Sequence, residues 1–435
     1  MQALLLDCKN RRDDLCARMG EGVAIIPTAP EVIRNRDSHF PYRFDSYFYY
    51  LTGFKEPESV LFLIGGHTPK TILFCRDKDM EREIWDGFRV GPQAAVNVLG
   101  VDEAYSLNEL ETLAPQLLAN QEKLFYSLGA DAAWDQRVLG WLKQLRERAR
   151  AGIAAPANIV DVRQLMDDMR LVKSPYELDT MRRSAQIAAA AHNRAMQKVK
   201  PNKIEYEIEA EFLHEFYRKG AQAAAYTSIV AGGANACTLH YNANNCVLND
   251  GDLLLIDAGC EFDGYASDIT RTFPVNGKFS AAQKDVYELV LAAQYAAIEK
   301  ANTKNHWNAP HEAGLNVLVQ GFIDFGLCQG SKDEVLENAT YRQFYMHRTG
   351  HWLGLDVHDA GEYKTKTGDW KMLEAGNVLT VEPGCYIRPA DNVPEHFWNI
   401  GIRIEDDVLV TEAGNEILTK DAVKTVADIE ALMKN

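Results

Sequence analysis

Hydrophobic positions with helical spacing recur from residue 174 onward and predict two long helices at the start of this part of the chain. Ser174 caps the first helix, because Pro175 takes the first helical position and Glu177 completes a capping box. The spacing predicts helices over 174–199 and 204–219, with strand-like segments after them.

The same order of elements is predicted a second time along the chain. Ser280 and Gln283 form a capping box for one helix, and a further helix is expected over 311–325. Apolar runs at 378–383 and 400–405 then predict another β region. Two copies of helix, helix and hairpin indicate an internal repeat.

Residues 1 to about 150 alternate short apolar runs with amphipathic helical spacing, which is typical of an α/β domain. Strands are expected at 23–27, 59–64 and 71–74, and helices at 108–120 and 135–150. The chain is therefore predicted to be an α+β protein in three parts. They are a smaller α/β domain at 1–160, a connecting segment at 161–173 and a larger domain at 174–435.

Aromatic residues are concentrated in 37–51, where charged residues lie among them. Such a stretch suits a binding surface, but packing in an ordinary core is the commoner arrangement for aromatic side chains. We therefore expect it to contribute mainly to the core of the N-terminal domain.

The composition limits which kinds of molecule the chain is expected to bind. With 435 residues, 46% hydrophobic and 25% charged, the chain has room for several domains of ordinary globular type. A formal charge of −16 argues against nucleic acid or an anionic membrane as the main partner. The apolar stretch 3–6 is too short for a signal peptide or a membrane span, and eight cysteines without a C-x-x-C spacing favour reduced thiols. A cytoplasmic location is expected.

Two pairs of carboxylates stand out in the β regions of the larger domain. Asp257 and Asp268 flank the polar turn 261–264, and a simple antiparallel register would place them directly opposite each other. Opposed residues have Cβ atoms only ~5 Å apart, where like charges repel. Glu382 and Glu405 are related in the same way across a longer loop. Four converging carboxylates need cations, which predicts two divalent metal ions.

A glycine-containing segment with three histidines, 347–359, offers nitrogen ligands to the same ions. His347 and His351 have the spacing of a zincin helix, but Arg348 stands where that motif requires Glu, and the glycines disfavour a helix. We expect a loop and strand with close backbone approach. A water or hydroxide bridging two metals attacks carbonyl carbon, so metal-assisted amide hydrolysis is the predicted chemistry.

Five segments of the larger domain together resemble the metallopeptidases of the pita-bread fold, a family that includes methionine aminopeptidase, prolidase and Xaa-Pro aminopeptidase. These segments are 254–259, 268–274, 347–359, 380–384 and 401–406. The resemblance covers most of 174–420 and implies that the larger domain has the pita-bread fold.

The resemblance also implies five ligands for two divalent metal ions, most often manganese in peptidases that act on Xaa-Pro bonds. These ligands are Asp257, Asp268, His351, Glu382 and Glu405. Asp268 and Glu405 would bridge the ions, and Glu382 would also transfer a proton. Three histidines would hold the substrate or stabilise the reaction intermediate, and an arginine would support the site. They are His240, His347, His358 and Arg403.

Segments 37–58, 83–85 and 269–279 resemble the aminopeptidase P branch of this family. That branch releases the first residue from peptides with proline in second position. Its members often form homodimers or homotetramers, in which N-terminal residues approach a neighbouring active site. Asp37 and Trp85 match those positions, and packing between domains is the alternative role for both.

Two positions depart from the family pattern. Arg348 stands where the family usually has Gly, at the rim beside the metals. The segment 302–310 replaces the usual Pro-Gly turn between helices, and His306 within it is expected to be a loop residue.

Three alternatives to the aminopeptidase remain within the fold. Prolidase would share all five ligands but would cleave only dipeptides. Non-catalytic pita-bread proteins bind protein or nucleic acid, and a creatine hydrolase of this fold works without metal. The presence of the five ligand residues argues against the last two.

Overall fold

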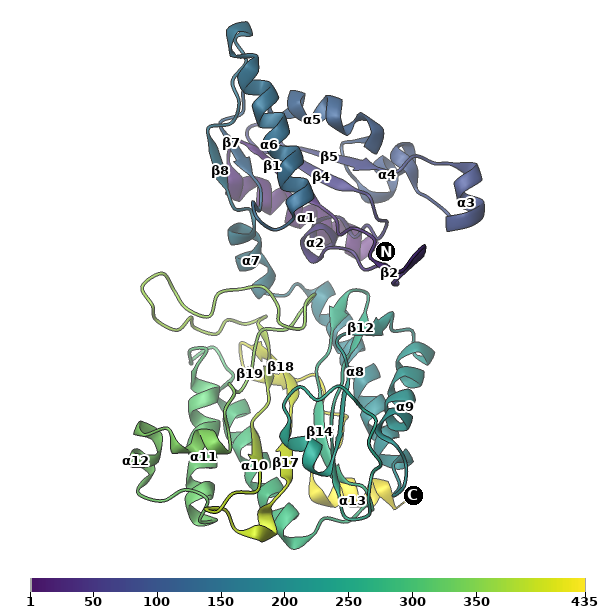
Figure 1. Cartoon of the computed structure of the whole chain (residues 1–435). Helices are drawn as coiled ribbons and strands as arrows, with labels where there is room; N and C mark the ends of the chain where they lie inside the picture. The colour runs from purple at the N-terminus through teal and green to yellow at the C-terminus, as the bar shows by residue number, and fades with distance from the viewer. Residues whose placement is uncertain (1, 435) are drawn as a thin grey trace. The chain divides into compact units, whose positions relative to one another are not determined.

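The computed structural model describes residues 2–434, which form two compact units divided between Met169 and Arg170 (Figure 1). The division falls within the predicted connecting segment 161–173. This segment is mostly helical, because α7 occupies Arg163–Leu171.

The N-terminal unit is built on a mixed six-stranded sheet with the order β6-β5-β4-β1-β7-β8. Its strands are β1 Val23–Pro27, β4 Val60–Ile64, β5 Lys70–Cys75, β6 Glu103–Ser106, β7 Lys123–Phe125 and β8 Asn158–Val160, with β2 Ile33–Asn35 and β3 Ser38–His39 forming a separate hairpin. Its other helices are α1 Gln2–Met19, α2 Ser46–Thr52, α3 Met80–Asp86, α4 Gly91–Leu99, α5 Leu110–Leu118 and α6 Ala132–Glu147. The predicted strands correspond to β1, β4 and β5, and the predicted helices to α5 and α6. Apolar side chains of α5 and α6 pack on the sheet to form one core.

The aromatic stretch of this unit divides between surface and core. Residues 33–40 are exposed, whereas α2 buries Phe48, Tyr49 and Leu51 almost completely. Asp45 caps α2 by accepting from the backbone N–H of Phe48. Core packing is therefore the role of the second part of the stretch.

The C-terminal unit repeats one order of elements, a pair of helices followed by strands. Its helices are α8 Pro175–Lys198, α9 Glu205–Arg218, α10 Ala281–Lys300, α11 Ala309–Asp324, α12 Lys332–Glu337 and α13 Val426–Met433. The first set of strands comprises β9 Ala223–Ala224, β10 Ile229–Gly232, β11 Leu253–Asp257, β12 Cys260–Phe262, β13 Tyr265–Ala266 and β14 Thr270–Pro274. The second comprises β15 Val378–Val381, β16 Gly384–Ile387, β17 Ile400–Arg403, β18 Asp406–Thr411 and β19 Gly414–Ile417.

The pairs α8–α9 and α10–α11 flank the strands of this unit (Figure 1). Apolar residues from all four helices and from both sets of strands form one large core. The capping boxes predicted at Ser174 and Ser280 are both present and start α8 and α10. The strands that flank the four predicted acidic ligands are therefore held by one continuous apolar core.

The two hairpins that carry the paired acids differ in register. In the second hairpin Val381 pairs with Asp406 and Gly384 with Arg403, so Glu382 lies opposite Glu405, as predicted. In the first hairpin Asp257 pairs with Thr270, so the predicted direct opposition of Asp257 and Asp268 is wrong by two residues.

The turn of the first hairpin explains this difference. Its two central residues are Asp263 and Gly264, with φ of 51° and 85°, whereas the simple register placed the centre one residue earlier, between Phe262 and Asp263. Asp-Gly with positive φ at both positions is the preferred two-residue hairpin turn. Asp268 consequently faces Gly259, where a Cβ atom would lie only 1.6 Å from the carbonyl oxygen of Ser267.

All eight cysteines are free, in line with the expectation of reduced thiols. Within residues 2–434 none of the helices has the length and apolar character needed to cross a bilayer.

Candidate metal centre and active site

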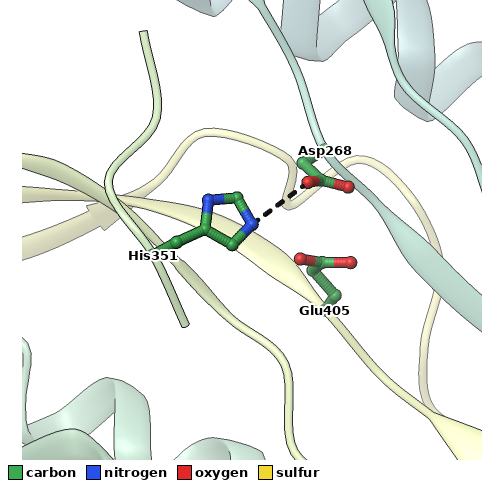
Figure 2. A group of neighbouring side chains, drawn as sticks. All are labelled: Asp268, His351 and Glu405. Carbon is green, nitrogen blue, oxygen red and sulfur yellow. Dashed lines mark ion pairs between the residues drawn. The ribbon is translucent and has the colours of Figure 1, made fainter. Parts of the chain in front are cut away.

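The five predicted ligands line one cavity: four acids lie where the strand ladders of the two hairpins are interrupted, and His351 comes from a separate loop. One ligand atom from each of Asp268, His351 and Glu405 lies within 4.8 Å of the other two. These residues come from three separate segments of the chain and point toward a common point (Figure 2). Nε2 of His351 lies 3.4 Å from Oδ2 of Asp268 and 3.8 Å from Oε1 of Glu382.

Asp257 joins this group through Tyr226, whose hydroxyl lies within hydrogen-bond distance of Oδ1 of both Asp257 and Asp268. Sequence reasoning missed Tyr226, because a tyrosine outside any ligand motif carries no distinguishing pattern. All five predicted ligands and Tyr226 line one cavity of about 690 Å³. The arrangement is that of a carboxylate-rich cation site.

Burial and mutual repulsion destabilise the ionised acids. Burial, with the neighbouring Asp257 charge, raises the pKa of Asp268. Burial also raises the pKa of Glu382 to about 7, and burial together with Asp268 raises the pKa of Glu405 well above its usual value. Carboxylates that resist ionisation together become stable anions when cations lie between them. The donor set therefore fits divalent cations, which prefer carboxylate oxygen with imidazole nitrogen as a further ligand.

The ring of His351 is oriented for metal binding by its own backbone contact. Nδ1–H donates to the carbonyl oxygen of Trp352 at 2.9 Å, so in the neutral ring the lone pair is on Nε2, which faces the acids. Burial alone would lower the pKa of His351, but the hydrogen bond and charge of Asp268 outweigh it and raise the pKa to about 9. A cation at Nε2 would replace that proton.

The histidine segment is a loop, as predicted, but the strand also expected in it is reduced to one isolated bridge between Trp352 and Leu379. Its glycines allow close backbone approach, because a Cβ atom on Gly350 would lie 2.0 Å from the carbonyl oxygen of Thr380. The backbone N–H of Thr380 donates to the carbonyl oxygen of His351 at 3.0 Å. This contact fixes His351 beside β15, the strand that leads to Glu382.

A chain of hydrogen bonds runs from Asp257 to His347. Arg403 donates to Oδ2 of Asp257 at 2.7 Å and to the Tyr386 hydroxyl at 2.9 Å. The Tyr386 hydroxyl lies 2.8 Å from Nε2 of His347, whose Nδ1–H donates to the carbonyl oxygen of Arg348. Burial, with the charge of Arg403, lowers the pKa of His347 to about 4, so the ring is neutral and Tyr386 donates to it. Arg403 thus fixes both a predicted ligand and one wall of the cavity.

The other two predicted histidines present exposed rings to the cavity. The ring of His358 lies 4.3 Å from that of His351, centroid to centroid, and partial desolvation at the cavity wall, together with the neighbouring His351, lowers the pKa of His358. His240 lies on the loop between β10 and β11. Both are placed to meet a molecule that enters the cavity.

The loop that carries His240 is organised by one buried carboxylate at the start of α9. Oε1 of Glu205 accepts from the backbone N–H of Gly232 at 2.8 Å, and Oε2 accepts from the Tyr241 hydroxyl at 2.7 Å and the backbone N–H of Cys246 at 2.9 Å. Glu205 has no exposed surface. It is a positioning residue that sequence reasoning missed, since its partners are distant in the chain.

Replacing Glu205 with Gln is therefore expected to lower kcat/KM on a peptide substrate about tenfold. The amide supplies one acceptor oxygen in place of two, and each buried donor left unsatisfied costs ~1–3 kcal/mol. Glu207→Gln on the same helix is the matched control, because Glu207 accepts from the backbone N–H of Ile204 and the amide oxygen of Gln can accept in the same way. Steady-state kinetics and limited proteolysis of the 233–246 loop measure the effect. Unchanged kinetics with an unchanged cleavage pattern in Glu205→Gln would contradict this role.

Two known protein families match the two parts of the chain separately. Residues 179–412 match the family described as "Metallopeptidase family M24", and residues 8–126 match "Aminopeptidase P, N-terminal domain". The chain is 45% identical over 428 residues to the Xaa-Pro aminopeptidase of Escherichia coli K12, with 98% of this chain and 97% of the relative covered. The chain belongs to the Xaa-Pro aminopeptidase family. Haemophilus influenzae has a further Xaa-Pro aminopeptidase, 46% identical over 427 residues, with 98% and 96% covered.

Solved structures of the Xaa-Pro aminopeptidase family share the same fold. Pseudomonas aeruginosa aminopeptidase PepP superposes with a TM-score of 0.97 at 48% identity, covering 99% of this chain and 98% of that one. A variant of E. coli aminopeptidase P in complex with substrate has a TM-score of 0.96 at 44% identity, with 99% and 98% covered. The predicted α+β class with a pita-bread domain is confirmed, and the chain is a metallopeptidase and thus a hydrolase.

Two residues expected in Xaa-Pro aminopeptidase sites lie in the N-terminal unit. Asp37 is exposed in the turn between β2 and β3, and Trp85 in α3 is 83% exposed. Their part in catalysis stays a prediction, as does the partner subunit that it requires.

Proposed function

We propose that this chain removes the N-terminal residue from peptides with proline in second position, using two divalent cations. The observation that supports this most is the meeting of four carboxylates and the lone pair of His351 in one cavity of a member of this family. Buried carboxylates that repel one another destabilise the fold unless cations lie between them, which favours a metal-binding role.

The cations are proposed to be bound by Asp257, Asp268, His351, Glu382 and Glu405. When bound, they would lower the pKa of water and so provide a nucleophile at neutral pH. Oxygen ligands with one nitrogen suit manganese, which we propose as the native metal.

This chain's own side chains would handle the substrate and the protons. Glu382 lines the cavity, and we propose that it takes a proton from the attacking water and delivers it to the leaving proline nitrogen. His240 and His358 would contact the substrate and stabilise the negative charge that develops on the carbonyl oxygen. Arg403 would hold Asp257 in place, and His347, with both ring nitrogens engaged, would brace the cavity wall.

The N-terminal unit is proposed to act through assembly. Exposed apolar side chains of β2 and α3, among them Ile33, Ile84 and Trp85, suit contact with a second copy of the chain. A homodimer or homotetramer would bring Asp37 and Trp85 to a neighbouring active site. A cytoplasmic location is part of the same proposal.

A panel of peptides tests the activity. With manganese present, Arg-Pro-Pro and Xaa-Pro dipeptides are compared with Arg-Ala-Pro, a matched peptide lacking proline in second position. Release of the first residue from Arg-Pro-Pro is expected, with Arg-Ala-Pro cleaved at least a hundredfold more slowly (about 2.7 kcal/mol). Cleavage of dipeptides alone would identify a prolidase, and cleavage of neither peptide class would refute the proposal.

A further inference from the structure

The rim of the cavity carries a cation that the catalytic proposal does not use. Arg348 directly follows His347, is exposed, and lines the cavity together with His358 and Glu382. It is also one of the two departures from the family pattern noted in the sequence.

Two neighbours hold the guanidinium of Arg348 away from the acids. Its Cζ lies 5.0 Å from the ring centroid of Trp370, a cation–π contact. Its Nη2 donates to Oδ1 of Asn308, the residue that precedes α11 and belongs to the second departure, 302–310. Three residues from distant parts of the chain thus fix one positive charge at the cavity mouth.

A second cation shares the same indole. Nζ of Lys364 lies 4.4 Å from the Trp370 ring centroid, and Lys364 and Trp370 pair across a short hairpin. Within residues 2–434 neither Arg348 nor Lys364 is within ion-pair distance of a carboxylate, although Asp369 lies in the same hairpin, where it accepts from Thr367. Two cations that are not neutralised by the chain itself favour an anionic ligand.

Negatively and positively charged side chains occupy different parts of the cavity. The four carboxylates of the interior are assigned to the two cations, whereas Arg348 lines the cavity and Lys364 lies beside it on the Trp370 ring. In an aminopeptidase only one residue of the substrate precedes the cleaved bond, so every carboxylate that a simple peptide carries downstream lies toward the exit. The rim is therefore complementary to the leaving part of the substrate.

We propose that Arg348, steadied by Trp370 and assisted by Lys364, binds a carboxylate on the residue that follows proline and so favours anionic leaving peptides. The proposal rests on the Xaa-Pro aminopeptidase activity proposed above. The carboxylate is either the C-terminus of a tripeptide or an acidic side chain in third position. Arg suits this task because its planar fork binds a carboxylate through two parallel hydrogen bonds.

Three peptides separate these sources of charge: Ala-Pro-Gln-amide, Ala-Pro-Gln with a free C-terminus, and Ala-Pro-Glu-amide. For the wild-type chain with manganese at low salt, each anionic peptide is expected to exceed the neutral amide about three- to tenfold in kcat/KM, chiefly through KM. In Arg348→Gln these ratios are expected to fall to about one, while Arg348→Lys retains part of the preference. Raising the ionic strength should shrink the wild-type ratios.

Lys366→Gln is the matched control, because it removes an exposed positive charge from the same hairpin without touching the Trp370 contact. Its ratios should equal those of the wild type. Equal kcat/KM for all three peptides in the wild type, or a full preference in Arg348→Gln, would overturn the proposal. A preference for only one anionic peptide would identify the source of the carboxylate.

Calorimetric binding of the same peptides to the Glu382→Gln chain, which keeps Arg348, provides a second measurement; its manganese content is determined first, because Glu382 is itself a proposed ligand. Tighter binding of the anionic peptides, abolished when Arg348→Gln is added, supports the rim proposal even if hydrolysis is too slow to follow. Loss of cleavage for all three peptides in the wild type would instead count against the proposed activity, so the two failures are distinguishable.

Discussion

Asp268→Asn and Glu382→Gln are each expected to lower kcat/KM on Arg-Pro-Pro by at least about a thousandfold. This corresponds to ~4 kcal/mol of transition-state stabilisation. The amide that replaces Asp268 would be a poorer cation ligand, and Gln in place of Glu382 could not carry a proton. Both carboxylates lie at the centre of the group formed around His351.

The same two variants should remain folded. Removing one negative charge from a buried cluster whose acids already have raised pKa values relieves repulsion in the cation-free chain. Circular dichroism and urea unfolding without cations should therefore give a free energy of unfolding equal to or above that of the wild type. Asp285→Asn, on the exposed face of α10, is the matched control for loss of a single carboxylate. Near-normal turnover in either site variant would be incompatible with the proposed centre.

Removal of cations with a chelator is expected to abolish activity and to lower thermal stability. The loss of activity should exceed a hundredfold, because nothing else in the cavity would lower the pKa of water to near neutral. The loss of stability follows from linkage, since a ligand at a hundred times its dissociation constant contributes about 2.7 kcal/mol to the folded state. Metal content by elemental analysis, peptidase assays and thermal melts measure the three quantities.

Adding back manganese should restore activity and thermal stability together. Repeating the experiment with a series of divalent cations would show which cation restores both most effectively. In Asp268→Asn the melting temperature should respond much less to manganese, which separates binding at this centre from binding elsewhere. Full turnover by a chain shown to hold no metal would end the two-cation proposal.

Much of the scaffold could be predicted because its elements carry local patterns. The capping boxes at Ser174 and Ser280 fixed the starts of α8 and α10 within a residue. The long N-terminal helix α1 was not predicted, since its apolar positions are interrupted by charges. Two of these charges, Arg11 and Arg12, are buried and donate to the carbonyl oxygens of Tyr50 and Leu51, contacts that only the tertiary fold creates.

The candidate site was predictable to the extent that its residues belong to motifs. The register of the second hairpin was predicted correctly by taking the middle of its loop as the centre. The register predicted for the first hairpin was wrong, because the Asp263-Gly264 turn was not taken as its centre. Tyr226 and Glu205 act through hydrogen bonds to residues far away in the chain, and one sequence holds no trace of such pairings. Side chains that act only by positioning other residues could therefore be identified only from the structure.

The first hairpin closes with a two-residue turn and the second with a long loop, so insertions and deletions should be tolerated differently in the two places. One residue added at Asp263-Gly264 that shifted β13 and β14 by one position would also displace Asp268 between them, because side chains alternate along a strand. The broad segment between β16 and β17 can absorb extra residues without shifting Glu382 or Glu405, whose ladders on both sides hold them in step. Natural or engineered variation in loop length should accordingly collect around 388–399 and spare the tight bend at 263–264.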